Sequence, residues 1–173
     1  MIEIGALSAS PETIESLSRL LIDAVAGGAG VSFMHPLTPA SARYFWRNAF
    51  ERQARADCLI LGASDKGAFL GTITLILDMP ENQPHRGEIS KVIVDAGARR
   101  RGIARALLQY AEEEARLRAR TLLVLDAVTD SAAAILYERC GWIKVGNIPD
   151  YAYLPHGTLW PTTVFYKRLA PRT

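Results

Sequence analysis

The chain has 173 residues, of which 49% are hydrophobic and 22% charged, which is typical of one globular domain with its own core. The formal net charge is +2, so the composition argues against a general role in binding nucleic acid. No apolar run is long enough to predict a membrane span, and the N-terminus has no secretory pattern. We therefore expect a cytoplasmic protein with neither nucleic acid nor membrane as a partner.

The first part of the chain predicts one strand and two helices. Residues 1–7 have the pattern of a short strand, and Ser10 before Pro11 is a helix N-cap signal. This helix should end at Gly27, where a glycine-rich connection over residues 27–34 begins. Thr38 before a second proline predicts another helix, running to about residue 55.

The rest of the chain predicts a mixed sheet. Two apolar runs around a short turn read as an antiparallel hairpin, and a strand, a helix and a strand then form a crossover that makes their strands parallel. Within that helix, Glu112 and Arg116 have the spacing of an exposed ion pair. The expected ranges are strands 58–63, 69–77, 88–94, 121–126, 142–145 and 164–168, and helices 102–118 and 131–140. We expect one α/β domain over residues 1–173.

The junction between strand 88–94 and helix 102–118 is the most informative segment. It carries Arg99, Arg100 and Arg101, and Gly102 opens the helix. A helix N-terminus offers unpaired N–H groups and a positive dipole, and guanidinium groups add charge-assisted hydrogen bonds. The sequence thus predicts a site for a phosphate or pyrophosphate, held by the N–H groups of residues 101–105. Neither GxxxxGK[ST] nor GxGxxG is present, which argues against nucleoside triphosphates and dinucleotides.

Two motifs carry a resemblance to a known superfamily. Arg99-x-x-Gly102-x-Ala104 is similar to the [Q/R]-x-x-G-x-[G/A] signature of the GNAT N-acetyltransferases. Residues 130–142 resemble the later N-x-x-A-x-x-L-Y-x-x-x-G-[FW] motif, with Asp130 where the superfamily often has Asn. The resemblance implies a mixed, mostly antiparallel twisted sheet with a central parallel pair, flanked by helices on both faces. It also implies acetyl-CoA as co-substrate and a main-chain oxyanion donor near Val92 or Ile93.

The expected acetyl-CoA contacts combine the strand end, the arginine loop and the start of the last helix. They are Val92, Ile93, Val94, Arg99, Arg100, Arg101, Gly102, Ile103, Ala104, Arg105 and Ser131.

Within the superfamily, the chain resembles the tabtoxin-resistance acetyltransferases over four segments: 27–34, 88–91, 123–126 and 146–169. Those enzymes acetylate the free amine of a small β-lactam amino acid. The resemblance therefore implies a small-molecule amine as acceptor, an antimetabolite or antibiotic amino acid among the candidates.

Two carboxylates are candidates for the general base that acetyl transfer to an amine needs. Strand alternation predicts Glu88, Ser90, Val92 and Val94 on one face of their strand. Asp126 ends an apolar run, where desolvation would raise its pKa. By resemblance, both acids align with residues proposed as bases in the tabtoxin-resistance enzymes.

Structural explanations for these acids stay open. Glu88 has Arg86 and Lys91 nearby in sequence as ion-pair partners, and Asp126 has the spacing to cap the loop before the next helix.

Tyr137 occupies the superfamily's tyrosine position, which implies that its phenol protonates the leaving thiolate of CoA; a core tyrosine is the alternative. Phe33 and Tyr151, both expected in loops, are candidate acceptor contacts. Cys58 and Cys140 lack metal-ligand spacing, and we expect no metal and no disulfide.

Three functions remain to be separated. A peptide N-acetyltransferase would share the chemistry but needs an open groove, whereas a small amine needs a closed pocket beside the glycine-rich segment. A CoA-sensing module would need the arginine loop without an acid or base. Superfamily members are often dimers, so a homodimer is left open.

Overall fold

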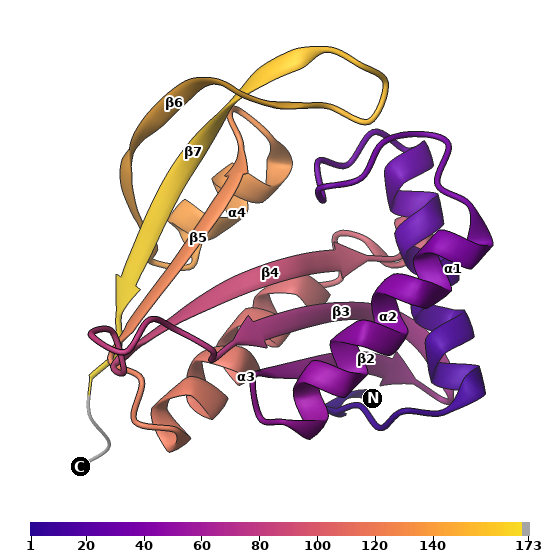
Figure 1. Cartoon of the computed structure of the whole chain (residues 1–173), viewed down its shortest axis with the longest axis horizontal. Coiled ribbons are helices and arrows are strands. Elements are labelled where there is room, and N and C mark those ends of the chain that lie inside the picture. Colours follow the sequence, from indigo (N-terminus) through magenta and orange to yellow (C-terminus); the bar gives the residue numbers. More distant parts are fainter. Residues whose placement is uncertain (171–173) are drawn as a thin grey trace.

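Seven strands form one twisted sheet in the computed structural model, which describes residues 1–170 (Figure 1). The strand order is β1-β2-β3-β4-β5-β7-β6, and all neighbours are antiparallel except β4 and β5. The strands are β1 (Ile2–Ala6), β2 (Cys58–Asp65), β3 (Ala68–Ile76), β4 (Arg86–Val94), β5 (Leu122–Val128), β6 (Ile143–Tyr153) and β7 (Leu159–Arg168). The helices are α1 (Pro11–Ala26), α2 (Pro39–Ala54), α3 (Ile103–Leu117) and α4 (Ala132–Arg139), and a 3-10 turn spans Ala96–Ala98. The predicted fold class is confirmed.

The capping signals place the first two helices as predicted. Ser10 Oγ accepts the N–H of Thr13 at 3.1 Å, and Thr38 Oγ1 accepts the N–H of Ser41 at 3.2 Å. Each cap satisfies one N–H that has no partner inside the helix.

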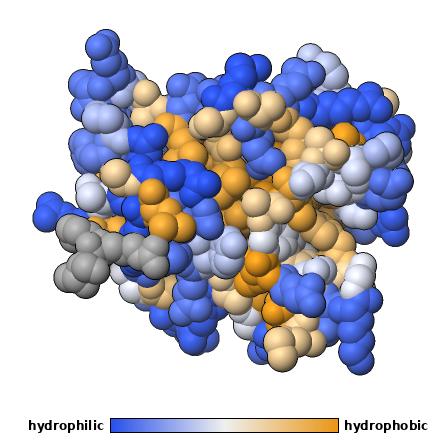
Figure 2. All heavy atoms as spheres, turned by 90° about the horizontal axis from the view of Figure 1, so that it is seen from below, coloured by the Kyte–Doolittle hydropathy of each residue, from blue (hydrophilic) through white to orange (hydrophobic). Residues whose placement is uncertain are grey.

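Helices cover both faces of the sheet and create two apolar cores. One core lies under α3 and α4 and includes Leu107, Leu123 and Phe165. The other lies under α1 and α2 and includes Leu21 and Trp46. Seen from below, apolar side chains occupy the middle of the molecule with hydrophilic side chains around them (Figure 2).

The last two strands are much longer than predicted. β6 and β7 pair as far as Tyr153 and Leu159, so Tyr151 lies in a strand and the predicted loop is wrong. β6 is an edge strand with almost every residue exposed, so its sequence has no inward-facing alternation to reveal it. The register also shifts between Ile148 and Ala152, around Asp150, whose φ is +49°.

A β-bulge in β4 overturns the predicted alternation. Thr74 pairs with Ser90 but Thr72 pairs with Ile93, so β4 has one extra residue opposite β3, and Lys91 has a φ of +52°. Ile93 consequently packs against the α1–α2 core.

The bulge also redistributes the other apolar residues of β4. Ile89, Val92 and Val94 all pack against the α3–α4 core, so Val92 and Val94 do not share a face with Glu88. Alternation cannot foresee a bulge, because the inserted residue shifts every later side chain to the opposite face.

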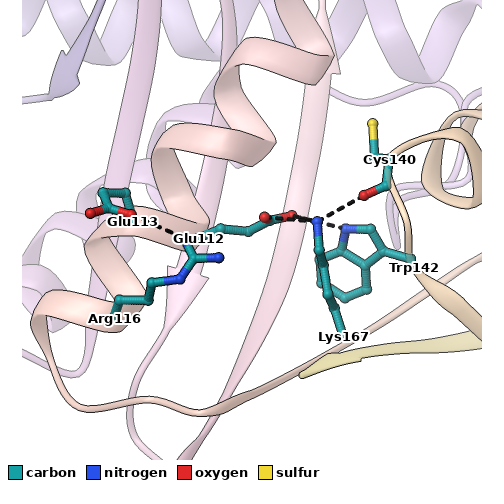
Figure 3. A network of polar contacts seen from close by, with 6 residues as sticks. All are labelled: Glu112, Glu113, Arg116, Cys140, Trp142 and Lys167. Atoms are coloured by element: carbon teal, nitrogen blue, oxygen red, sulfur yellow. Dashed lines mark hydrogen bonds and ion pairs between the residues drawn. The ribbon is translucent and has the colours of Figure 1, made fainter. Parts of the chain in front are cut away.

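Glu112 makes a buried contact instead of the predicted surface pair. Its two carboxylate oxygens each accept a hydrogen bond from Lys167 Nζ at 2.8 Å, and Oε1 also accepts one from Trp142 Nε1 at 3.2 Å (Figure 3). Lys167 also donates to the carbonyl oxygen of Cys140 at 2.8 Å. Arg116 pairs with Glu113, one residue further along α3. This network joins α3 to β7 and to the turn after α4.

We predict that Lys167→Met lowers the free energy of unfolding by about 3 kcal/mol, because Glu112 would remain as a buried, unpaired charge. Urea denaturation followed by circular dichroism measures this. The matched control is Arg116→Met, which breaks the more exposed pair on the same helix and should cost less than about 1 kcal/mol. Equal losses in the two variants would contradict a structural role for the buried network.

Candidate active site

The divergence of β4 and β5 defines the candidate site. The two strands pair over three positions, from Arg86 opposite Leu122 to Glu88 opposite Val124. Beyond that point β5 continues along β7 to the pair between Val128 and Thr162, and Figure 1 shows β4 and β5 separating. The β5-facing edge of β4 after Glu88 therefore has no strand partner within residues 1–170.

The end of β4 presents main-chain groups to this divergence. The N–H of Asp95 donates to the carbonyl of Leu70 at 2.9 Å. Bonded and non-bonded positions alternate in an antiparallel pair, so Ile93 turns its polar groups toward β3 and Val94 turns its own toward β5. The side chains of Val92 and Val94 belong to the core, which leaves their main chain as the part available to a ligand.

The arginine loop ends in a left-handed turn that opens α3. Arg100 has a φ of +63° and Gly102 a φ of +79°, and the N–H of Ala106 donates to the carbonyl of Gly102 at 3.0 Å. The N–H groups of residues 103–105 precede this bond and have no helical acceptor. The Ile103 side chain is buried, so the part of this residue left for an anion is its main-chain N–H, and the anion contact itself stays a prediction.

The arginines of this loop differ in their surroundings. Arg101 Nη2 contacts Asp65 Oδ2 at 3.1 Å, which ties it to the turn between β2 and β3. Arg99, Arg100 and Arg105 are exposed and take part in no ion pair within the described chain. They are the guanidinium groups available to an anion.

Ser131 has a capping role at the start of α4. Its Oγ accepts the N–H of Ala134 at 3.2 Å, which leaves the hydroxyl proton available to donate.

Tyr137 projects from α4 into the core beside Trp142 and Phe165, with ring-centroid distances of 6.2 and 5.9 Å. Its side chain is buried, and its hydroxyl makes no hydrogen bond within residues 1–170. Burial raises the pKa of Tyr137, and the negative charge of Asp126 raises it further. The phenol therefore keeps its proton at neutral pH.

Asp126 is exposed, so the desolvation expected from the preceding apolar run does not occur. In β5, Leu123 and Leu125 face the core and Asp126 points to the other side of the strand. Thr162 Oγ1 lies 2.8 Å from Asp126 Oδ2 and 2.9 Å from the carbonyl of Ala127. This threonine fixes the orientation of the carboxylate.

Glu88 forms an ion pair with Arg86, which was one of its two expected structural partners. Arg86 is held in turn by Gln83 Oε1 at 2.6 Å. Lys91, the other expected partner, forms no ion pair within residues 1–170.

Lys91 is the residue of this site that the sequence interpretation missed. Its Nζ lies 5.8 Å from the ring centroid of Phe33 and 5.6 Å from that of Phe45, and 3.4 Å from Ser32 Oγ. Burial lowers the pKa of Lys91, and the negative charge of Asp126 opposes that shift. The sequence signal that could have revealed Lys91 was a cationic residue within the otherwise mostly apolar strand 88–94.

The segment after α1 meets the β6–β7 hairpin. The N–H of His35 donates to the carbonyl of Pro155 at 2.9 Å, and the rings of His35 and His156 lie 4.9 Å apart. A Cβ on Gly30 would lie 2.3 Å from Val128 Cγ2, so only glycine permits this approach to β5. Phe33 lies in a loop, as predicted, and the contacts of this loop place it beside the divergence of β4 and β5.

Tyr151 is 53% exposed on β6, and it forms no ring pair with Phe33 and no cation–π contact or hydrogen bond with Lys91 among the described residues. Asp126 lies within electrostatic reach of both Lys91 and Tyr137.

Within residues 1–170, no group of three or more His, Cys, Asp or Glu side chains is placed to hold a metal ion. Both cysteines are free thiols. Among the same residues, no helix has the length and apolar character needed to cross a membrane.

Comparison with solved structures finds similar chains throughout their length. An N-acetyltransferase from Staphylococcus aureus Mu50 is 24% identical, with a TM-score of 0.82 over 98% of this chain and 99% of that one. A ribosomal-protein-alanine N-acetyltransferase from Brucella melitensis is 25% identical, with a TM-score of 0.81 and coverage of 96% and 99%. The yncA protein of Salmonella typhimurium, solved with its cofactor acetyl-CoA, is 18% identical, with a TM-score of 0.80 and coverage of 99% and 96%.

The family model for the acetyltransferase (GNAT) family matches residues 24–142. That range includes the arginine loop, the divergence of β4 and β5, and Tyr137. The chain belongs to the GNAT acetyltransferase family, whose members use acetyl-CoA.

Proposed function

We propose that this acetyltransferase moves the acetyl group of acetyl-CoA directly to the amine of a small molecule. The observation that carries the proposal is the divergence of β4 and β5. The candidate anion site at the start of α3 lies on one side of it, and the hydrogen bond between His35 and Pro155 closes the other side. Holding two substrates in one place supplies much of the rate of such a transfer.

The pyrophosphate of acetyl-CoA would bind at the start of α3. The N–H groups of residues 101–105 and the guanidinium groups of Arg99 and Arg100 fit its charge. Arg105 is exposed one turn further and fits the same role. The Ser131 hydroxyl can donate to CoA while its oxygen caps α4.

The thioester would lie along the unpaired edge of β4. The expected donors were the main-chain N–H groups near Val92 or Ile93, but Ile93 turns its polar groups toward β3. We therefore propose that a main-chain N–H of Val92 or Val94 donates to the carbonyl oxygen as it becomes an oxyanion, which is where such donors act most strongly. Tyr137 keeps its proton and can pass it to the departing thiolate.

Asp126 is the better candidate for the base that removes the proton of the acceptor ammonium. It is exposed, oriented by Thr162 and close enough for its charge to act on Tyr137 and Lys91. Glu88 is occupied by Arg86. We infer that Glu88 supports the site through that ion pair and does not carry the proton.

The contact between His35 and Pro155 supports a small acceptor. It joins the segment before α2 to the β6–β7 hairpin, across the place where an extended peptide would need an open groove. A peptide acceptor is the second candidate, because the similar Brucella melitensis protein is a ribosomal-protein-alanine N-acetyltransferase. The small acceptors include antimetabolite and antibiotic amino acids.

A panel of amines incubated with acetyl-CoA, with release of the CoA thiol as readout, tests the proposed function. We expect release with small amines and not with N-terminal peptides of ribosomal proteins. Release with peptides alone would favour the second candidate. No release with any amine, despite acetyl-CoA binding, would favour a CoA-sensing role.

Gly102→Asp should abolish acetyl-CoA binding measured by calorimetry. A carboxylate would enter the anion site, and φ at this position is in the left-handed region. Gly102→Ala is the control, because its Cβ meets nothing within 4 Å and adds no charge. We expect the alanine variant to weaken binding about tenfold or less, since it adds only backbone strain of about 1 kcal/mol. Tight binding by Gly102→Asp would place the pyrophosphate elsewhere.

Asp126→Asn should lower kcat about 100-fold or more, the contribution typical of a general base, and leave the acetyl-CoA Kd unchanged. Glu88→Gln is the matched control and should lower kcat less than tenfold. If Glu88→Gln lowered kcat more than Asp126→Asn does, Glu88 would be the general base and Asp126 the supporting residue.

Tyr137→Phe should also lower kcat with little change in the acetyl-CoA Kd, because it removes the proton and keeps the ring contacts with Trp142 and Phe165. A thermal unfolding curve for the variant separates this effect from loss of the core. Unchanged kcat would assign Tyr137 to packing alone.

A further inference from the structure

Lys91 occupies an unusual position for a lysine. It lies at the bulge of β4 with a φ of +52°, a backbone conformation that is costly for a residue with a long side chain. The bulge brings its amine to Phe33 and Phe45, beside the divergence of β4 and β5. Strained residues of this kind concentrate at ligand sites.

The charge of the Lys91 ammonium group has no ion-pair partner within residues 1–170 to replace the hydration that it loses on burial. Burial removes part of its hydration, and no carboxylate lies within ion-pair distance of it in residues 1–170. Two ring faces and the Ser32 hydroxyl at 3.4 Å are its contacts. A partly desolvated ammonium of this kind gains more from an anionic ligand than an exposed lysine does.

Lys91 on β4 and Asp126 on β5 thus place opposite charges on the two sides of the divergence. Asp126 stands on β5, and its charge acts on Lys91 from across the divergence without forming an ion pair. A ligand with an ammonium group and an acidic group would complement both side chains at once. A simple amine would complement Asp126 alone.

We propose that Lys91 binds an anionic group of the acceptor, so that the preferred acceptor is a small amine that also carries an acid group. This inference rests on the proposed function, because it requires an acetyl acceptor that binds on the side of β4 where Phe33 and Phe45 lie. The Ser32 hydroxyl shares the anion with the lysine. Lys91 is therefore a specificity-determining residue, and Asp126 meets the other end of the acceptor.

Paired acceptors that differ in whether they carry the acid group test the proposal. Each pair consists of an amino acid and its carboxamide with the same side chain, and acetylation is followed by CoA thiol release. For the unaltered protein we expect kcat/KM to favour the acid by about tenfold or more, as a charge-assisted hydrogen bond would give. Lys91→Met should lose this preference through a higher KM for the acid, and leave kcat/KM for the carboxamide within about threefold.

Two further variants give the comparison its control. Lys66→Met removes an exposed lysine at a φ of +50°, so it matches the charge change and the backbone conformation without touching the site. It should keep the preference for acids. Lys91→Arg should retain part of that preference, because it keeps the positive charge.

The outcomes separate this inference from the function on which it rests. If both members of each pair are acetylated alike, or if Lys91→Met lowers both alike while it still binds acetyl-CoA and unfolds at the usual temperature, the role of Lys91 is overturned and acetyl transfer stands. If neither member of any pair is acetylated although acetyl-CoA binds, the proposed function fails, and the assignment of Lys91 fails with it.

Discussion

The limited pairing of β4 with β5 is the constraint on which the site depends. The two parallel strands share three residue pairs, and after them each strand follows a different antiparallel neighbour. A bulge at Lys91 adds a residue to β4 at this point. The main chain beyond Glu88 is left without a strand partner among the described residues. Unsatisfied main-chain groups are costly in a buried sheet, so a ligand that supplies hydrogen bonds there is favoured.

Within the sheet, β5, β6 and β7 meet the other strands through those three pairs, and the apolar core under α3 and α4 also joins the two halves. Lys167 on β7 adds a polar attachment by bonding Glu112 on α3, and Trp142 and the carbonyl of Cys140 complete the polar contacts (Figure 3). Both oxygens of the buried carboxylate are thereby satisfied. The network thereby joins the second half of α3 to the turn that follows α4, the helix that carries Tyr137.

Local signals in the sequence were sufficient for much of the fold. Ser10 and Thr38 mark helix starts because an N-cap requires a short polar side chain, and the crossover through α3 follows from the order of its elements. The left-handed Gly102 was likewise foreseen as the opening of a helix. Each of these features depends on a few neighbouring residues.

Features set by distant contacts were missed or misread. The burial of Glu112 depends on Lys167, which is 55 residues away, so its spacing to Arg116 was misleading. The exposure of Asp126 follows from its side of β5, and the apolar residues before it gave no indication of that. Lys91 has its role through a bulge and through Phe33 and Phe45, which no periodicity in β4 reveals.

The contact between His35 and Pro155 is made by main-chain atoms. The His35 and His156 rings lie beside it, and the glycine at position 30 lets the loop approach Val128. Substitutions of the Ser32 and Phe33 side chains would remove neither main-chain partner of this hydrogen bond. Under the proposed function, the hydrogen bond that closes the acceptor end is distinct from the side chains that would choose the acceptor, so substitutions in one short loop would be enough to give a new specificity without a new fold.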